Sequence, residues 1–128
     1  MNRRRAAYDL PPLRLNRNLA LAAQDRLEDM MSRHYFDHIA PDGMAPWLWV
    51  RRHGYLWQEV AENLATGFRT ERGVVNGWMR SPWHRATMLG NYVEVGLASV
   101  EAIPHRQGKG HTVVAIYARP RAEVVAAR

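Results

Sequence analysis

Six histidines are the residues of this chain with the greatest chemical potential, and two of them have neighbours that suggest a site. His38 follows the first long helix expected from the sequence, and His84 lies in the first turn of a later helix that Ser81 can cap. Between them, Glu62 lies in a short mixed segment at the end of an expected strand. Two imidazoles and one carboxylate can hold a divalent cation such as zinc and leave a coordination position for water.

The set formed by His38, Glu62 and His84 permits more than one role. The separation of these residues along the chain matches no local metal motif, so spacing alone does not define a metal centre. Glu62 can also act with either histidine as a general acid-base pair, although no obvious nucleophile accompanies them. A third alternative is structural, with Glu62 and the histidines hydrogen bonded to one another and holding the strand end against the helices.

The other four histidines are better explained by their places in the expected elements. His34 is four residues before His38, but it completes the apolar stripe of a helix that ends before His38. His53 ends a short helix, where a cationic side chain favours the helix dipole. His105 is expected in a loop and His111 at the start of a strand, and both are expected to be solvated.

An amphipathic helix over residues 16–33 must position His38. Its apolar side chains recur at helical spacing, and they are Leu19, Ala22, Ala23, Leu27, Met30 and Met31. Asn16 can cap the first turn of this helix. A loop then leads to a short aromatic helix over residues 46–53 and a brief strand over residues 57–61, which places Glu62 at the end of that strand.

Two more helices and a hairpin complete the expected elements. Thr70 can cap a third helix that presents Val74, Val75 and Trp78 on one face, and Ser81 followed by proline opens the turn that holds His84. Residues 92–101 and 111–118 are β-branched and aromatic, and residues 104–110 join them as a long hairpin loop. Helices first and a hairpin last, with one strand between them, predict an α+β fold.

Composition narrows the class of protein. The chain has 128 residues, which is the size of one domain, and its 47% hydrophobic and 23% charged residues are ordinary for a globular protein. The absence of cysteine excludes disulfides, thiolate zinc sites and thiol catalysis. No apolar run approaches the roughly 20 residues of a membrane span, and no signal peptide is present in this chain.

The net charge of +6 gives only weak support for a nucleic-acid partner. All but one of the 18 basic residues are arginines, which is typical of a coding bias, and they are scattered along the chain. We therefore expect no specific nucleic-acid binding, but a general attraction to anionic surfaces. The five tryptophans lie within apolar patterns, which favours core positions and groove walls over base stacking; they are Trp47, Trp49, Trp57, Trp78 and Trp83.

At these residues the chain resembles the CAP superfamily of cysteine-rich secretory proteins, antigen 5 and pathogenesis-related 1 proteins. It is most similar to the bacterial, cysteine-free SCP-like branch. The resemblance runs in order over nearly the whole chain through short motifs: Leu10-Pro11-Pro12-Leu13, Tyr35-Phe36-Asp37-His38, Pro41-Asp42-Gly43, Gly54-Tyr55, Ala61-Glu62-Asn63-Leu64-Ala65, Trp78-Met79-Arg80-Ser81-Pro82, His84-Arg85 and Val95-Gly96. It implies one CAP domain over residues 1–128, built as an α-β-α sandwich with a small antiparallel sheet between helical layers.

The resemblance also implies a cleft, lined in the family by two histidines and two acidic residues that in some members bind zinc or another divalent ion. His38, Glu62 and His84 take three of these positions, and Ser81 takes the place of the second acidic residue. The cleft expected here therefore consists of His38, Glu62, Ser81 and His84, with His38 and His84 as metal ligands and Glu62 as the candidate catalytic group. Trp83 stands where the bacterial pattern has a small residue, and its indole is expected to narrow the cleft.

Family members are mostly secreted, so the resemblance implies an extracytoplasmic or secreted protein. It predicts that the first helix is truncated here, and that an export signal or anchor precedes this chain. The leading hypothesis is a non-catalytic binding module whose cleft holds a lipid or a cell-wall component. The positive net charge of the chain favours anionic lipids or anionic wall polymers. The alternative is a divalent-metal-dependent hydrolase that uses the same cleft.

Overall fold

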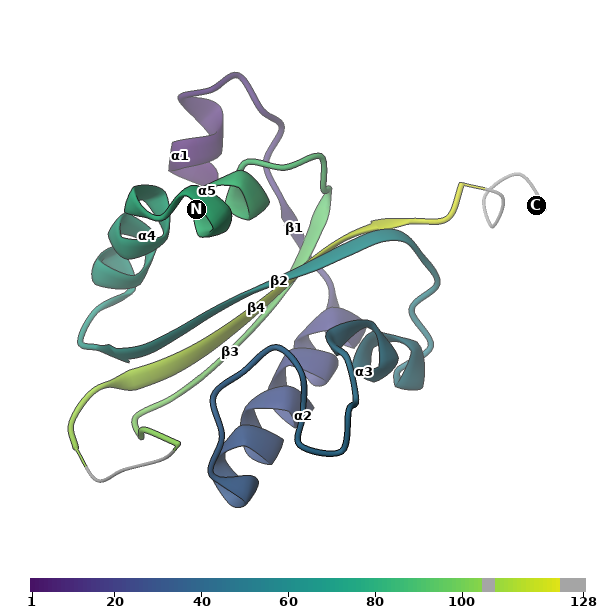
Figure 1. Ribbon diagram of the computed structural model, residues 1–128. Helices are drawn as coiled ribbons and strands as arrows, with labels where there is room; N and C mark the ends of the chain where they lie inside the picture. Colours follow the sequence, from purple (N-terminus) through teal and green to yellow (C-terminus); the bar gives the residue numbers. More distant parts are fainter. Residues whose placement is uncertain (105–107, 123–128) are drawn as a thin grey trace.

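A four-stranded sheet with helices on both faces organises the chain in the computed structural model, which describes residues 1–104 and 108–122 (Figure 1). The strands are β1 (Arg14–Leu15), β2 (Trp57–Phe68), β3 (Glu94–Val100) and β4 (His111–Pro120), in the order β1-β3-β4-β2. β4 pairs antiparallel with both β2 and β3, while β1 runs parallel to β3. The long strand β2 therefore forms one edge of the sheet.

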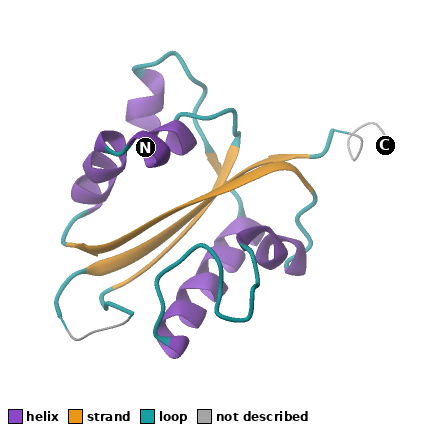
Figure 2. Cartoon of the chain, viewed as in Figure 1, coloured by secondary structure: helices purple, strands orange, loops and turns teal. Residues whose placement is uncertain are grey.

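Two groups of helices cover the two faces of the sheet (Figure 2). The helices α2 (Arg17–Arg33) and α3 (Pro46–Arg52) lie on one face, and α1 (Asn2–Ala6), α4 (Glu71–Arg80) and α5 (Pro82–Met88) lie on the other (Figure 1). This arrangement confirms the expected α+β class and the α-β-α sandwich. Among residues 1–104 and 108–122, no helix combines the length and the apolar character that a bilayer crossing requires.

The alternation of side chains along β4 divides the core into two clusters. Val114, Ile116 and Ala118 pack with the apolar stripe of α2, while Ala115 and Tyr117 pack with α4 and α5 on the other face. All five side chains are fully buried, as expected for the strand that has a neighbour on each side. Both helical layers are thereby fixed to one central strand.

The first turn of α2 is held tightly against β3. Asn16 caps the helix as predicted, because its side-chain oxygen accepts a hydrogen bond from the Leu19 amide at 3.0 Å. The backbone N–H of Asn16 donates a hydrogen bond to the Val95 carbonyl of β3 at 3.0 Å. Gly96 is buried directly beneath this turn, where an added Cβ would overlap the backbone of Leu19 and Ala20. The helix and the strand therefore touch backbone to backbone at this position.

Most of the other predicted elements are present. The helix α3 begins at Pro46, the Thr70 hydroxyl caps α4 by accepting a bond from the Gly73 amide at 2.9 Å, and β3 and β4 form the predicted hairpin. His53 caps the end of α3 and also contacts Asp25 at 2.6 Å. His111 begins β4 but is partly buried rather than solvated, and His105 lies outside the described residues.

Two predictions about the strands were wrong. The strand expected over residues 57–61 continues to Phe68, so Glu62 lies in the middle of β2 rather than at a strand end. Glu62 and Asn63 are polar and interrupt the apolar alternation of the strand, so the local pattern predicts that the strand ends there. In the fold, both side chains have buried hydrogen-bond partners, which allows the strand to continue. The sheet is also not purely antiparallel, because the two-residue strand β1 pairs parallel with β3 and is too short to show a period.

Candidate functional site

The carboxylate of Glu62 is held by a buried arginine of α2. Even-numbered residues of this part of β2 face the α2 layer, and Arg26 meets Glu62 there with two hydrogen bonds, Nε to Oε2 at 2.9 Å and Nη2 to Oε1 at 3.0 Å. The Arg26 side chain is fully buried and that of Glu62 is nearly so. A two-point bond between a guanidinium and a carboxylate fixes both position and orientation, so Glu62 is a rigid group.

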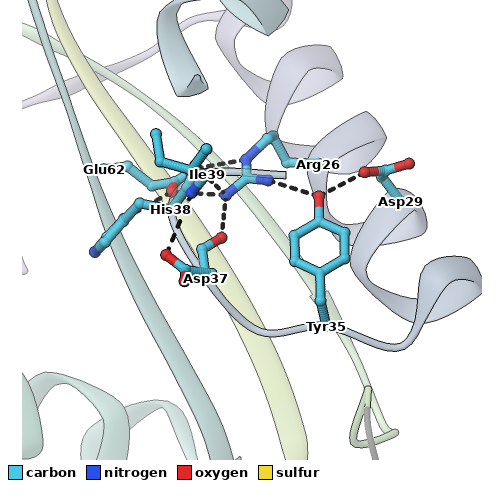
Figure 3. A network of polar contacts seen from close by, with 7 residues as sticks. All are labelled: Arg26, Asp29, Tyr35, Asp37, His38, Ile39 and Glu62. Atoms are coloured by element: carbon cyan, nitrogen blue, oxygen red, sulfur yellow. Dashed lines mark hydrogen bonds and ion pairs between the residues drawn. The ribbon is translucent and has the colours of Figure 1, made fainter. Parts of the chain in front are cut away.

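The remaining donors of Arg26 bind the segment that follows α2 (Figure 3). Nη2 donates to the carbonyl oxygens of Asp37 at 2.8 Å and His38 at 3.1 Å, and Nη1 donates to the Tyr35 hydroxyl at 3.0 Å. The Tyr35 hydroxyl in turn donates to the Asp29 carboxylate at 2.5 Å. One buried side chain thus fastens the loop that carries His38 to the strand that carries Glu62.

His38 completes this cluster from the solvent side. Its Nδ1 lies 2.9 Å from Glu62 Oε1, and about half of its side chain is exposed. A hydrogen bond to a carboxylate at one ring nitrogen fixes the ring and points the other nitrogen, Nε2, outward. The hydrogen bond with Glu62 raises the pKa of His38 above its ordinary value. Burial acts in the opposite direction, but its effect is smaller.

The second pair of predicted residues lies on the opposite face of the sheet. His84 Nδ1 lies 2.7 Å from Ser81 Oγ, and its ring stacks on Trp78 with a centroid separation of 6.5 Å. The amide of Asn63, on the odd-numbered face of β2, donates to the His84 carbonyl at 3.0 Å. Burial, and after it the charge of His38, lowers the pKa of His84. The two histidines therefore approach β2 from opposite layers and interact electrostatically.

The donor set does not fit a resident metal ion. Glu62 gives both oxygens to Arg26 and one of them also to His38, so no carboxylate oxygen is left free of a cation or a donor. Two imidazoles remain, whereas catalytic zinc sites use three protein ligands. Within residues 1–104 and 108–122, no three side chains of histidine, aspartate or glutamate are grouped so that they could hold an ion. Ser81 is engaged with His84 and contributes no charge.

A cavity of about 180 Å³ opens beside the exposed ring of His38. Glu62 and His38 form its polar side, and its apolar side consists of Ile39, Pro46, Trp47, Val60 and Ala61. Ile39 and Trp47 are nearly half exposed, so the apolar wall reaches the surface. The site therefore combines a small hydrophobic hollow with one fixed, titratable imidazole.

Trp83 does not have the role that the sequence predicted, which was to form part of the core or of a groove wall. Its side chain does not line the cavity at His38 and is 85% exposed, so it is neither core nor a narrowing of this hollow. Trp49 and Trp78 are buried in the core as predicted, and Trp47 lines the cavity at His38. The apolar pattern around residue 83 reflects α5, whose buried face is carried by Met88 instead.

Arg26 is a residue of the site that the sequence patterns did not identify. It lies four residues after Ala22 and four before Met30, which places a charged side chain within the buried stripe of α2. A charge in that position requires a buried partner of opposite sign. A charged residue within an apolar stripe is therefore the sequence signal that could have identified Arg26. Only the fold shows that the partner is Glu62, 36 residues further along the chain.

We expect the pKa values of the two histidines of the site to lie on opposite sides of the ordinary histidine pKa of about 6.5. His38 should titrate above it and His84 below it, as measured by imidazole NMR signals across a pH series. The substitution Glu62→Gln should bring the pKa of His38 back towards about 6.5, because the charged hydrogen-bond acceptor is lost. By linkage, the stabilising effect of the His38–Glu62 bond is complete below pH of about 6.5 and is lost as the pH rises through the folded-state pKa. Indistinguishable titration of the two rings would contradict this assignment.

Comparison with known proteins shows which proteins the chain is similar to. The sequence model of the cysteine-rich secretory protein family, CAP, matches residues 1–117. The protein YkwD of Bacillus subtilis is 32% identical over 102 residues, which cover 79% of this chain and 40% of YkwD. The chain thus spans well under half of the length of this curated relative.

Two solved structures share the fold. One is an extracellular protein of Bacillus anthracis that contains an SCP domain, with a TM-score of 0.78 at 23% identity over 92% of this chain and 37% of that protein. The other is an outer surface protein of Borrelia burgdorferi, with a TM-score of 0.80 at 19% identity over 94% of this chain and 86% of that protein. At these identities the likeness concerns the arrangement of helices and strands alone.

Proposed function

Because the chain belongs to the cysteine-rich secretory protein (CAP) family, we propose that it is an extracytoplasmic, non-catalytic binding domain whose ligand occupies the cavity at His38. Two relatives by fold are described as an extracellular protein and an outer surface protein, which supports this location. The ligand class proposed is an anionic amphiphile, meaning a lipid or cell-envelope component with an apolar chain and an acidic head.

The observation that carries this proposal is the pairing of an apolar wall with a single fixed imidazole. Ligand sites are typically apolar hollows with a few well-placed polar groups. The wall of Ile39 and Trp47 offers contact to an acyl chain, and the outward Nε2 of His38 offers a donor to a carboxylate or phosphate. The raised pKa of His38 extends the pH range over which that donor is charged.

The same geometry disfavours the hydrolase alternative. Glu62 is the candidate base, but both of its oxygens accept hydrogen bonds from the buried guanidinium of Arg26, and Oε1 also contacts His38, so its contacts suit positioning rather than proton transfer. Its role in this site is to orient His38. The site is therefore best suited to holding a ligand.

Titration calorimetry with oleate tests the cavity. We expect saturable binding that weakens as the pH rises through the pKa of His38, because the imidazole loses its charge. Trp47→Ala should weaken binding about tenfold through lost apolar contact, and His38→Gln should remove the pH dependence. Trp83→Ala is the matched control, since it removes an exposed indole outside the cavity. Binding that is unchanged by both cavity variants, or absent with oleate and with lysophosphatidylglycerol, would refute the proposal.

A further inference from the structure

The positive charge of this protein is concentrated on one side of the sheet. Residues 1–13 and 69–93, which contain α1, α4 and α5, carry seven arginines and two acidic residues, a net charge of +5. Residues 16–56, which contain α2 and α3, carry five arginines and five acidic residues and are neutral overall. Nearly all of the net charge of +6 thus belongs to one of the two layers in Figure 1.

The arginines of this layer are exposed and not neutralised. Six of the seven lie on the surface: Arg3, Arg4, Arg69, Arg72, Arg80 and Arg85. Arg5 is the exception, because it is buried and donates to the backbone carbonyls of Pro11, Met88, Gly90 and Tyr92. None of these seven arginines forms an ion pair with an acidic group in the part of the chain that the structure describes. The positive field of the α1-α4-α5 layer is therefore directed to the outside.

The same layer presents aromatic rings to solvent. Trp83 in the first turn of α5 is 85% exposed, the most exposed large hydrophobic residue among those described. Tyr8, just after α1, is about half exposed and accepts a hydrogen bond at its hydroxyl from Arg85, whose guanidinium also lies over the ring. A single exposed aromatic side chain is ordinary, but aromatic rings beside arginines that have no acidic partner are typical of surfaces that lie at a lipid headgroup layer.

We propose that the α1-α4-α5 layer is a docking surface for an anionic phospholipid membrane. The arginines supply attraction to the negative surface, and the indole of Trp83 enters the interface between headgroups and acyl chains. A soluble polyanion requires only the positive charge, whereas the interface of an anionic membrane uses both the arginines and the exposed indole, which is why a lipid surface is favoured. This surface lies across the sheet from the cavity of His38 and requires no ligand there.

Vesicle co-sedimentation separates this proposal from simple charge attraction. The full chain should bind phosphatidylcholine vesicles that contain phosphatidylglycerol, should release them as salt increases, and should ignore pure phosphatidylcholine. Arg72→Gln with Arg80→Gln should weaken binding about tenfold or more. Arg17→Gln with Arg51→Gln removes the same charge from exposed sites on the opposite layer and should have a much smaller effect. Equal losses in the two double variants would overturn the proposal.

Two further measurements identify the partner. Trp83→Ala should weaken vesicle binding severalfold without changing the net charge, while Trp47→Ala should leave it unchanged because the cavity is not involved. Retained oleate binding by the Arg72 and Arg80 double variant would show that the layer and the cavity act separately. Binding to duplex DNA or a soluble wall polymer as tight as binding to vesicles, with no loss in Trp83→Ala, would overturn the membrane assignment in favour of a polyanion.

Discussion

Gly96→Ala is expected to lower the free energy of unfolding by about 3 kcal/mol, a large fraction of what a domain of this size has. The added methyl group has no space, because it would overlap the backbone of Leu19 and Ala20 at the start of α2. Side chains can rotate away from a new atom, but a helix backbone must move as a whole. The cost therefore includes separating α2 from β3, which this residue joins.

Urea unfolding followed by circular dichroism measures this loss, and Gly108→Ala supplies the control. Gly108 is exposed, and its nearest neighbour is the end of the Ile103 side chain at 3.3 Å, which can shift. The same chemical change should therefore cost little at Gly108. Equal unfolding midpoints for the two variants would mean that α2 does not rest on Gly96.

Arg26→Met is expected to cost about 3–5 kcal/mol of stability, the range for removing one partner of a buried ion pair. The substitution leaves the Glu62 carboxylate buried without its guanidinium, and it frees the carbonyls of Asp37 and His38. The double variant Arg26→Met with Glu62→Gln should lose less than the sum of the single changes, because the uncompensated charge is gone. Arg26→Lys should be intermediate, since an ammonium cannot make the two-point bond.

The matched control for Arg26 is Arg33, another arginine of α2. Arg33 pairs with Asp29 and Asp42 at the surface, where ion pairs contribute little, so Arg33→Met should cost at most about 1 kcal/mol. A loss in Arg26→Met no larger than in Arg33→Met would show that the buried cluster does not contribute to the fold. The comparison requires only denaturant unfolding at neutral pH.

Arg26→Met also has a readout at the site itself. The charge of Arg26 is one of the influences that lower the pKa of His38, although the hydrogen bond with Glu62 outweighs it. If the folded state persists, the imidazole NMR signal of His38 should therefore titrate at a higher pH in Arg26→Met than in the parent protein. A general loss of structure would instead move His38 towards its ordinary value, so the two cases are distinguishable.

Patterns within short stretches were sufficient to predict most of this fold. The 3.6-residue spacing of apolar side chains predicts α2, Asn16 and Thr70 cap their helices as expected, and β-branched runs predict the hairpin of β3 and β4. These features depend on neighbours along the chain, whose positions follow from backbone geometry alone. Because the motifs of the family are also local, the resemblance to CAP proteins and the candidates His38, Glu62, Ser81 and His84 were available at the same level.

The arrangement of those candidates depends on contacts between residues far apart in the chain. Glu62 was expected at a strand end, but it lies inside β2, where Arg26 and His38 both bind it. His38 and His84 come from opposite helical layers and contact different groups, Glu62 and Ser81, an arrangement that the spacing of the residues along the chain does not specify. A side chain's burial and charge environment are set by which elements pack together, and pairing across a sheet leaves no periodic mark in the sequence. The same reason explains the charged layer, since scattered arginines become one surface only when α1, α4 and α5 fold onto the same face.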